Sequence, residues 1–514
     1  METQGVQENQ KTMEVLIKSE VNKDSEIINE TREVCRVLPN GETVCFLNDR
    51  QGEITRKQIE ERYSQIRLTD KDEENGLELF CYIKCTNDDE DIVKKCRGVV
   101  FNKDKIVMKA FPFTREYSST DEDNVKSVFS QTDFTKCRFY NSVEGTLIRV
   151  FNFNDKWFVS THRKLNAFKS KWASKESFGD IFKRSLEEYM MNGGYEKVFD
   201  GVTESFDKES IKENTIEKVC SRLDKNNQYM FLVSNTPENR IVCTTKEVPE
   251  LIHVGTFKNG ELDLDDYVGF NKGKEHHFGS VEEMISEVES IDYDEFQGII
   301  AFLPNNEQVK ILTPKYQELF KIRGNESSIK FRYLQVRMNK RLSNGLYSLY
   351  PKYSKDFDDY ENILYKIAQF IYRSYIARYI SKRYITLPVE EFAVMRECHN
   401  WHCQDRGNNR INEEKVIEVL NQQPPTNLNH MIRRFRIDAS KHREKHASRQ
   451  YVTPKFGPKT PVVMDTHGAS SARGDTHGAS DGSSRQNTNI SPMVLPINSQ
   501  EARRTESMID PISV

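Results

Sequence analysis

The first candidate for chemistry in this sequence is a serine that precedes a Glu-Gly step. Ser142, Val143, Glu144 and Gly145 lie within the apolar segment 139–151, and a polar turn and a second apolar segment follow. This pattern predicts a β-hairpin. A serine hydroxyl ionises far above physiological pH, and the sequence shows no neighbouring base to activate it. Because the same four residues also occur in ordinary sheets, they indicate a site only in combination with other motifs.

Four further segments accompany this one in a fixed order: Lys95–Phe101 (KCRGVVF), Pro237–Val242 (PENRIV), Phe296–Ile300 (FQGII) and Gln308–Leu312 (QVKIL). Together they resemble the motifs of phage-type RNA ligases, which are covalent nucleotidyltransferases. Each motif is weak alone, and their order over residues 75–320 carries the resemblance. It implies a nucleotide-binding set of Arg97, Glu144, Gly145, Arg240, Gln297 and Lys310. Taken singly, Arg97 could be a structural ion-pair partner and Lys310 a solvated strand residue.

The departures from the family motifs all fall on reactive groups. The family has the lysine that accepts AMP where this chain has Ser142, and a serine cannot form the phosphoramidate. A metal-placing glutamate is replaced by Gln297, a phosphate-binding lysine by Leu312, and residues 229–237 lack the family's ribose-binding acid. An uncharged amide binds divalent ions poorly. The resemblance therefore implies no catalytic residue and no metal site, and it implies ATP and magnesium as cofactors only if the site functions.

Charge is unevenly distributed along the chain: residues 1–320, the acidic front, have a negative balance, and residues 321–450 have a positive one. Of 514 residues, 36% are hydrophobic and 30% charged, which allows two or three domains. The net charge of −4 combines a +11 balance in 321–450 (25 Lys and Arg, 14 Asp and Glu), no net charge in 451–514, and −15 in the first 320 residues. RNA or DNA is therefore expected to dock on 321–450. No stretch is apolar enough to span a bilayer, so no membrane partner is expected.

Four parts are predicted along the chain. A polar segment, 1–32, is expected to be disordered. An RNA-ligase-like nucleotidyltransferase domain, 33–322, is predicted to be α+β and built on antiparallel sheet. The reason is that strand-like segments at 97–113, 137–162, 228–244, 253–258 and 296–312 alternate with helical ones at 163–192 and 208–224. A basic helical domain, 323–450, comes next. The tail, 451–514, is expected to be disordered because of its low-complexity composition and its repeat of DTHGAS at 465–470 and 475–480.

The basic part contains one long amphipathic pattern. A helix is predicted from a cap at Asp356 to about Tyr384, with an apolar stripe that includes Tyr360 and Phe370 and basic residues on its other positions. The stripe could be a core face with solubilising charges, or a surface that binds phosphates and stacks bases. A second basic cluster gives three candidate nucleic-acid contacts, Arg433, Arg434 and Arg436.

Cys398, His399, His402 and Cys403 have the residue types of a metal site. Helical spacing pairs Cys398 with His402 and His399 with Cys403, which gives two ligands on each face rather than four around one ion. No second Cys/His pair lies nearby in sequence, so no metal site is predicted. The ten cysteines are scattered through mostly apolar segments, as expected for reduced thiols. A polar N-terminus predicts no secretory signal, and an intracellular location, in cytoplasm or nucleus, is expected.

The resemblance and its departures leave three functions open. The first is a degenerate RNA-ligase homologue, a pseudoenzyme that binds nucleic acid or protein. The alternative is an active ATP-dependent RNA ligase that joins RNA ends through an adenylated intermediate, and it needs a lysine from elsewhere because Lys136 is too distant along the strand. The third is a structural protein that uses its acidic and basic parts as assembly surfaces. Large DNA viruses keep ligase-like proteins of this kind, which adds the virion as a location.

Overall fold

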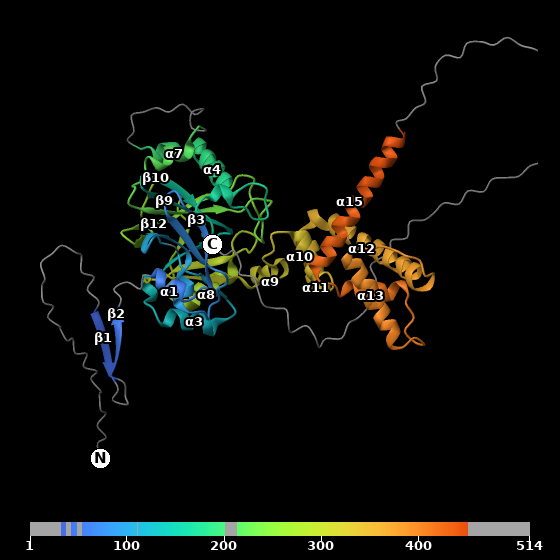
Figure 1. Cartoon of the computed structure of the whole chain (residues 1–514). Coiled ribbons are helices and arrows are strands. Elements are labelled where there is room, and N and C mark those ends of the chain that lie inside the picture. The colour runs from blue at the N-terminus through green and yellow to red at the C-terminus, as the bar shows by residue number, and fades with distance from the viewer. Residues whose placement is uncertain (1–31, 38–42, 49–53, 110, 201–212, 451–514) are drawn as a thin grey trace, which may run out of the picture. The chain divides into compact units, whose positions relative to one another are not determined.

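The computed structural model describes residues 32–37, 43–48, 54–109, 111–200 and 213–450. These residues form two compact units that divide between Lys321 and Ile322, named here the N-terminal and the C-terminal unit. Figure 1 shows that sheets dominate the first unit and helices the second, so the predicted α+β class is confirmed. The segments 1–31 and 451–514, both predicted to be disordered, lie outside the described residues.

Two five-stranded sheets form the frame of the N-terminal unit. In the first, the strand order is β10 (Lys156–Ser160), β9 (Gly145–Phe153), β11 (Gln228–Ser234), β12 (Leu251–Lys258) and β13 (Glu261–Asp263). In the second, it is β14 (Glu275–His276), β8 (Arg138–Ser142), β15 (Gly298–Phe302), β16 (Gln308–Leu312) and β7 (Arg115–Ser118). All neighbours pair antiparallel except β16 and β7, which are parallel.

Two smaller sheets precede these in the chain. The four-stranded sheet has the order β3 (Ile66–Asp72), β4 (Leu77–Tyr82), β5 (Arg97–Asn102) and β6 (Lys105–Met108). An antiparallel pair is formed by β1 (Arg32–Val37) and β2 (Thr43–Asn48). The segment 97–113, expected to be extended, therefore contains two short strands. They pair in a hairpin whose turn has Lys103 at a φ of 54°.

The predicted strand over 139–151 is interrupted, and this interruption builds the site. Its first half is β8, which pairs with β15 in one sheet, and its second half is β9, which pairs with β10 and β11 in the other. Val143 and Glu144 form the crossing between the two sheets. Only the second half forms the expected hairpin, and its turn residues Asn154 and Asp155 have φ values of 50° and 60°.

Helices cover the outer faces of the two five-stranded sheets. On the β9–β11 face, α4 (Phe178–Tyr189), α5 (Tyr195–Val198) and α7 (Thr215–Cys220) help enclose a core that includes Ile148, Phe182 and Phe231. On the β15–β16 face, α3 (Glu122–Ser130) and α8 (Val281–Ser290) enclose Phe139, Ile299 and Ile311. The short helices are α1 (Arg56–Glu60), α2 (Asp91–Lys95), η1 (Phe134–Lys136), η2 (Ala167–Lys169) and η3 (Met190–Gly194), and α9 (Pro314–Arg323) follows β16.

Two predicted elements of this unit are shorter than expected. In the segment 163–192, predicted to be helical, the α-helix α4 begins only at Phe178. Ser177 caps this helix, and Asp180 completes the capping box. The strand predicted over 228–244 ends at Ser234, where Thr236 and Asn239 form a local hydrogen-bonded turn around Pro237.

The C-terminal unit is helical. Its elements are α10 (Ile329–Val336), α11 (Lys340–Leu349), η4 (Pro351–Tyr353), α12 (Ser354–Tyr375), η5 (Ile376–Ile380), α13 (Val389–Gln404), α14 (Glu413–Asn421) and α15 (Pro425–Gln450). Two features predicted for the long helix are wrong. Asp356 lies inside the first turn instead of capping it, and Phe370 is exposed instead of belonging to the apolar stripe. No helix of the described residues is both long and apolar enough to cross a membrane.

Candidate functional site

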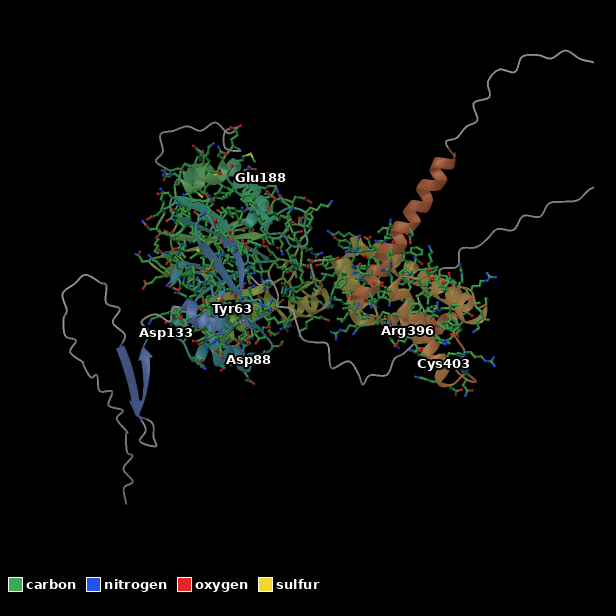
Figure 2. The ribbon with its side chains drawn as sticks, in the orientation of Figure 1. Tyr63, Asp88, Asp133, Glu188, Arg396 and Cys403 are labelled. Carbon is green, nitrogen blue, oxygen red and sulfur yellow. The ribbon has the colours of Figure 1, made fainter. Side chains whose placement is uncertain are left out.

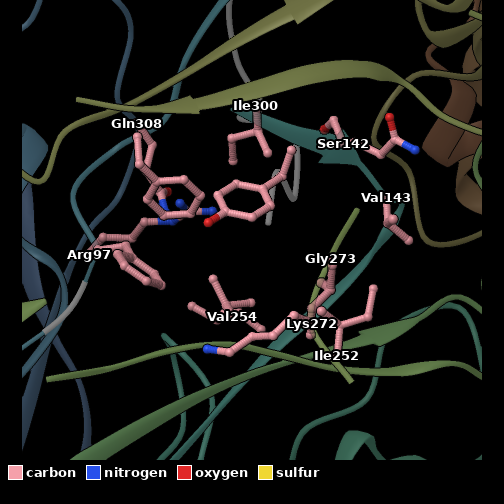
Figure 3. A pocket seen from close by; sticks show the side chains of 15 residues that line it. Arg97, Ser142, Val143, Ile252, Val254, Lys272, Gly273, Ile300 and Gln308 are labelled. Carbon is pink, nitrogen blue, oxygen red and sulfur yellow. The ribbon is translucent and has the colours of Figure 1, made fainter. Parts of the chain in front are cut away.

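A pocket lies in the N-terminal unit where the two five-stranded sheets face each other. It encloses about 660 Å³, counted out to its open mouth, and apolar side chains from β8, β9, β11, β12 and β15 form most of its lining. Five polar side chains also line it, those of Arg97, Asn141, Ser142, Lys272 and Gln308. Figure 3 shows Arg97 and Gln308 at one end of the pocket, Ser142 and Val143 at the other, and Lys272 along one wall.

Ser142 is held in a buried hydrogen-bond network. Its hydroxyl donates to Gln297 Oε1 over 2.8 Å, and Lys310 Nζ donates to the same oxygen over 2.8 Å. Gln297 Nε2 in turn donates to the hydroxyl of Tyr316 over 2.8 Å. Sheet register explains the meeting, because Gly298 pairs with Ser142 on one side and with Leu312 on the other. The serine is therefore held by a neutral amide to which a lysine also donates, with no carboxylate or histidine bonded to its hydroxyl in the described structure.

Lys310 is 1% exposed, so the alternative of a solvated strand residue is wrong. Burial lowers the pKa of its ammonium group, and the nearby Arg97 adds to that effect. Glu116 opposes it, because its Oε1 lies 3.8 Å from Lys310 Nζ. The strand presents this lysine to the network beneath Ser142 rather than to the pocket lining.

Glu144 is also buried, and it bonds to the backbone of a distant segment. Its Oε1 accepts a hydrogen bond from the backbone N–H of Val242 over 2.8 Å, so the carboxylate ties the β8–β9 crossing to the Pro-x-Asn-Arg-Ile-Val segment. Burial raises the pKa of this carboxyl group, while the Tyr316 hydroxyl and the neighbouring backbone N–H groups oppose that rise. The same crowding raises the pKa of Tyr316 well above its ordinary value.

The two predicted arginines of this unit behave differently. Arg97 lines the pocket and donates from Nη1 to Thr114 Oγ1 over 3.0 Å, and Thr114 donates to Gln308 Oε1 over 3.0 Å. Arg240 instead donates to the backbone carbonyls of Val242 and Cys243, over 2.7 Å and 3.1 Å, and is absent from the pocket lining. The structure therefore brings Arg97 to the pocket and uses Arg240 to stabilise a turn.

A third arginine was not predicted. Arg149 on β9 is fully buried and donates to the backbone carbonyls of Gly98 and Thr161, the latter over 2.6 Å. Burial lowers its pKa to about 10. This contact links the first five-stranded sheet to the Cys-Arg-Gly segment, where Gly98 has a φ of 84° and a Cβ would lie 2.6 Å from the carbonyl oxygen of His162. An arginine between Ile148 and Val150 in an apolar strand was the signal for it.

His253 provides a buried titratable group close to the pocket. It lies on β12 between the pocket residues Ile252 and Val254, is fully buried, and has its Nε2 3.1 Å from Thr256 Oγ1. Burial, with a smaller contribution from Lys272, lowers its pKa to about 3. The folded protein therefore keeps this imidazole neutral at pH values where the unfolded chain takes up a proton.

We expect this histidine to make the N-terminal unit sensitive to acid. The stability that it contributes is present above the unfolded pKa of about 6.5 and is lost as pH falls towards 3, which amounts to about 2 kcal/mol between pH 7 and pH 5. Chemical denaturation at both pH values should show this loss, and His253→Gln should remove that share of it. The exposed His277, changed to Gln in the same way, is the control. Equal pH dependence in the His253 variant and the parent would contradict the assignment.

Comparison with known proteins gives viral relatives. The chain is 28% identical over 396 residues to the immediate-early protein ICP-46 homolog of Invertebrate iridescent virus 6, which covers 72% of this chain and 83% of that protein. It is 24% identical over 263 residues, 48% of this chain and 34% of the other, to a putative bifunctional polynucleotide kinase/RNA ligase of Autographa californica nuclear polyhedrosis virus. The chain resembles viral RNA-ligase-like proteins. No protein-family model matches it.

Among solved structures, an archaeal ATP-dependent RNA ligase is similar, with 11% identity, a TM-score of 0.31, and coverage of 58% of this chain and 72% of that one. In this chain, the register of β8, β15 and β16 brings three of the predicted residues together. Ser142, Gln297 and Lys310 meet directly.

The predicted nucleic-acid arginines of the ligase-like protein lie on α15 in the C-terminal unit. Arg433 is exposed. Arg434 forms ion pairs with Glu390 and Glu391 at 2.9 Å and 2.7 Å, and Arg436 forms one with Asp359 at 2.5 Å and lies over the ring of Tyr360. Two of the three cations are therefore already compensated by carboxylates of α12 and α13.

The Cys and His residues of α13 are divided between different environments. Cys398 is buried, whereas Cys403 is exposed near the end of the helix, as Figure 2 shows. Cys403 Sγ lies 3.5 Å from His399 Nε2, and His402 Nδ1 lies 2.5 Å from the carbonyl oxygen of Asn409. Within the described ranges, no three His, Cys, Asp or Glu side chains are grouped so that they could hold a metal ion.

Proposed function

We propose that this ligase-like protein does not become adenylated and acts as a nucleic-acid-binding pseudoenzyme. The observation that carries the proposal is the network around Ser142. At the position where the family has its nucleophilic amine, this chain has a hydroxyl that donates its proton to Gln297 Oε1. Attack on the α-phosphate needs a group that can be deprotonated and aimed at phosphorus, and among the described residues the acceptor of this proton is a neutral amide oxygen and not a base.

The neighbouring groups fit neither magnesium nor a transferring phosphate. Magnesium needs hard, preferably anionic oxygen ligands, whereas Gln297 is a neutral amide and Glu144 is committed to the backbone of Val242. Leu312, at the position of the family's second lysine, packs in an apolar cluster with Ile241, Val242, Cys243 and Tyr316. Lys310 is buried beneath the network. A nucleotide held without covalent transfer would meet Arg97 and Lys272, the two cations of the pocket lining.

Nucleic-acid binding is assigned to the C-terminal unit because its residues 321–450 have the +11 charge balance. Cations near a polyanion gain free energy by releasing condensed counterions, so binding should be strong at low salt and weaken steeply with added salt. The acidic front of the chain, at −15, should contribute little. A protein without such binding would instead use the basic surface for assembly with other proteins, as a virion component would.

We expect that no covalent AMP adduct forms on this protein. The full-length protein is incubated with ATP labelled at the α-phosphate and magnesium, and then separated by denaturing electrophoresis. We expect no acid-labile labelled band at the length of the chain, because the only side chain at the nucleophile position is a hydroxyl. An active ligase of the same length run in parallel shows that the conditions support adenylation.

A labelled band would establish the alternative, an ATP-dependent RNA ligase. One observation favours a particular lysine for that case: Lys272 lines the same pocket, donates to the carbonyl of Leu264 over 2.8 Å, and has a pKa lowered by burial. Lys272→Met should then abolish the band. Lys274→Met, which changes an exposed lysine two residues away, should leave it.

A further inference from the structure

The connection between α12 and α13 exposes large side chains to solvent. Ile380 is 67% exposed, Tyr384 90% and Val389 81%. These three residues surround Lys382 and Arg383, which are exposed as well. Single exposed apolar side chains are ordinary on a protein surface, whereas these three lie close together in the sequence. The connection therefore differs from α12 itself, whose apolar stripe is mostly buried.

Backbone contacts hold this connection in a defined position. The N–H of Ser381 donates to the carbonyl of Ile376, and the N–H of Arg383 donates to that of Ala377, both over 2.8 Å. Between them Lys382 has a φ of 54°, in the left-handed region that lysine rarely adopts. The chain thus turns sharply at Lys382 and is tied back to the end of α12 on both sides, which presents Arg383 and Tyr384 from a fixed turn.

Cations and aromatic rings alternate around this turn. The guanidinium of Arg378 lies over the rings of Tyr379 and Phe392, at 5.8 Å and 5.3 Å from their centroids. Tyr379 stacks on His399 with centroids 3.7 Å apart and planes at 14°. Burial lowers the pKa of His399, and the neighbouring His402, Arg406 and Lys382 add to that effect. In the described structure, no Asp or Glu forms an ion pair with Arg378, Lys382, Arg383 or Arg406.

This lack of carboxylates separates the turn from the arginine cluster of α15. There, Arg434 and Arg436 bind Glu390, Glu391 and Asp359. A phosphate that approached them would have to compete with those carboxylates. At the α12–α13 turn a phosphate meets cations without such competition, and the charge of the unit favours its approach.

We propose that the α12–α13 turn, residues 378–389, binds single-stranded nucleic acid. A base stacks on Tyr384, and the flanking phosphates bind Lys382 and Arg383. This inference rests on the proposed function and names the surface and the form of the nucleic acid. Stacking on an exposed ring requires an unpaired base, because the faces of paired bases are covered by their neighbours. An anionic membrane suits the surface less well, since interfacial binding normally uses the continuous apolar face of a helix rather than a tight turn.

The test measures binding of the full-length protein to a fluorescent 12-nucleotide oligo(U) by anisotropy over a series of salt concentrations. Tyr384→Ala should weaken binding by about tenfold, as loss of one stacked base does, and Tyr384→Phe should restore most of the affinity. Lys382→Ala with Arg383→Ala should make the slope of log affinity against log salt shallower by about 1.4, or roughly 0.7 for each lost phosphate contact.

Matched controls lie on the two helices that flank the turn. Tyr365 on α12 is 50% exposed, and Arg396 on α13 is an exposed cation, labelled in Figure 2. Tyr365→Ala removes an exposed aromatic ring and Arg396→Ala an exposed cation, both away from the turn. Each should leave the affinity, and the slope of log affinity against log salt, close to the parent values. Since all these residues project into solvent, thermal unfolding of the variants should match the parent.

Three results would overturn the inference. If the parent binds oligo(U) but the turn variants bind as tightly as the controls, the turn is not the binding surface, although the proposed function stands. If a duplex of the same length competes as well as the single strand, base stacking is excluded. If vesicles containing phosphatidylserine bind through Tyr384 and oligo(U) does not, the surface is a membrane contact, and the proposed nucleic-acid function fails as well.

Discussion

Replacing Gly145 by valine should lower the free energy of unfolding of the N-terminal unit by about 3 kcal/mol or more. Gly145 is the first residue of β9 and pairs with Ser234 on β11. A Cβ at this position would lie 2.4 Å from the carbonyl oxygen of Val233 and 2.9 Å from a methyl group of Leu232. The closest atom belongs to the backbone of a paired strand, so the clash cannot be relieved by rotating a side chain. It must push β9 away from β11.

Tryptophan fluorescence can follow this unit during chemical denaturation. Trp157 and Trp172 lie in the N-terminal unit, and Trp401→Phe removes the remaining tryptophan of the chain. Gly273→Ala, made in the same background, is the control, because a Cβ there would be 3.5 Å from the ring of Tyr140, an ordinary contact. If Gly145→Val unfolds at the same denaturant concentration as the control, the strand placement around the β8–β9 crossing is wrong.

The sequence predicts the strands around the β8–β9 crossing, but it does not predict that they belong to two different sheets. Period-two patterns and turn residues identify strand content across 137–162, and Asn154 with Asp155 forms a turn as expected. The hydrophobic pattern of 139–151 does not indicate that the segment is divided between two sheets, because both halves are apolar and extended. It depends on which distant strands are available, β15 for the first half and β11 for the second. Pairing over 80 to 160 residues of chain is not encoded by any local segment.

The long helix shows a different limit. Tyr360, Ile363 and Ile367 have the helical spacing of the predicted apolar stripe and are buried, so the core alternative is the correct one for them. The spacing predicts wrongly for Phe370, because the buried width of the stripe depends on which helices pack against it. It also extends the helix to about Tyr384, whereas α12 ends at Tyr375 and a π-helical turn follows to Ile380. No proline or glycine lies between the end of α12 and Pro388, so the local sequence contains no signal that predicts this helix end.

In the site, motif order predicts more than composition does. The resemblance brings Ser142, Gln297 and Lys310 into one set, and the structure shows that Ser142 and Lys310 both donate to Gln297 Oε1. Tyr316 completes the network from α9, and Arg149 fixes the Cys-Arg-Gly segment from β9. Tyr316 lies outside the motif segments, and Arg149 lies in 139–151 but outside its Ser-Val-Glu-Gly step. The apolar neighbours of Arg149 indicate that it is buried, but the partners of both side chains depend on the packing of the folded unit.

The same network supports a prediction about restoring the family's lysine. Ser142→Lys would place a second ammonium group beside Gln297 Oε1, which already accepts from Lys310 over 2.8 Å. Two like charges about 5 Å apart at an effective dielectric constant of about 20 repel by about 3 kcal/mol. One of them can escape by losing its proton, which limits the penalty. We therefore expect Ser142→Lys to lower the unfolding free energy by about 2 to 3 kcal/mol and to yield no AMP adduct, since Leu312 and Gln297 remain.

Adding Gln297→Glu tests the electrostatic origin of that loss. A carboxylate at 297 would lie between the two ammonium groups. Its second oxygen could accept from the Tyr316 hydroxyl, which in the parent accepts from Gln297 Nε2. The double variant should therefore recover about 2 kcal/mol relative to the sum of the single changes. The four proteins of this cycle are compared by chemical denaturation at pH 7. Ser142→Met, which is long and uncharged, separates the effect of volume from that of charge. If Met costs as much as Lys and the cycle shows no coupling, then steric crowding, and not the positive charge of Lys310, keeps a lysine out of this position.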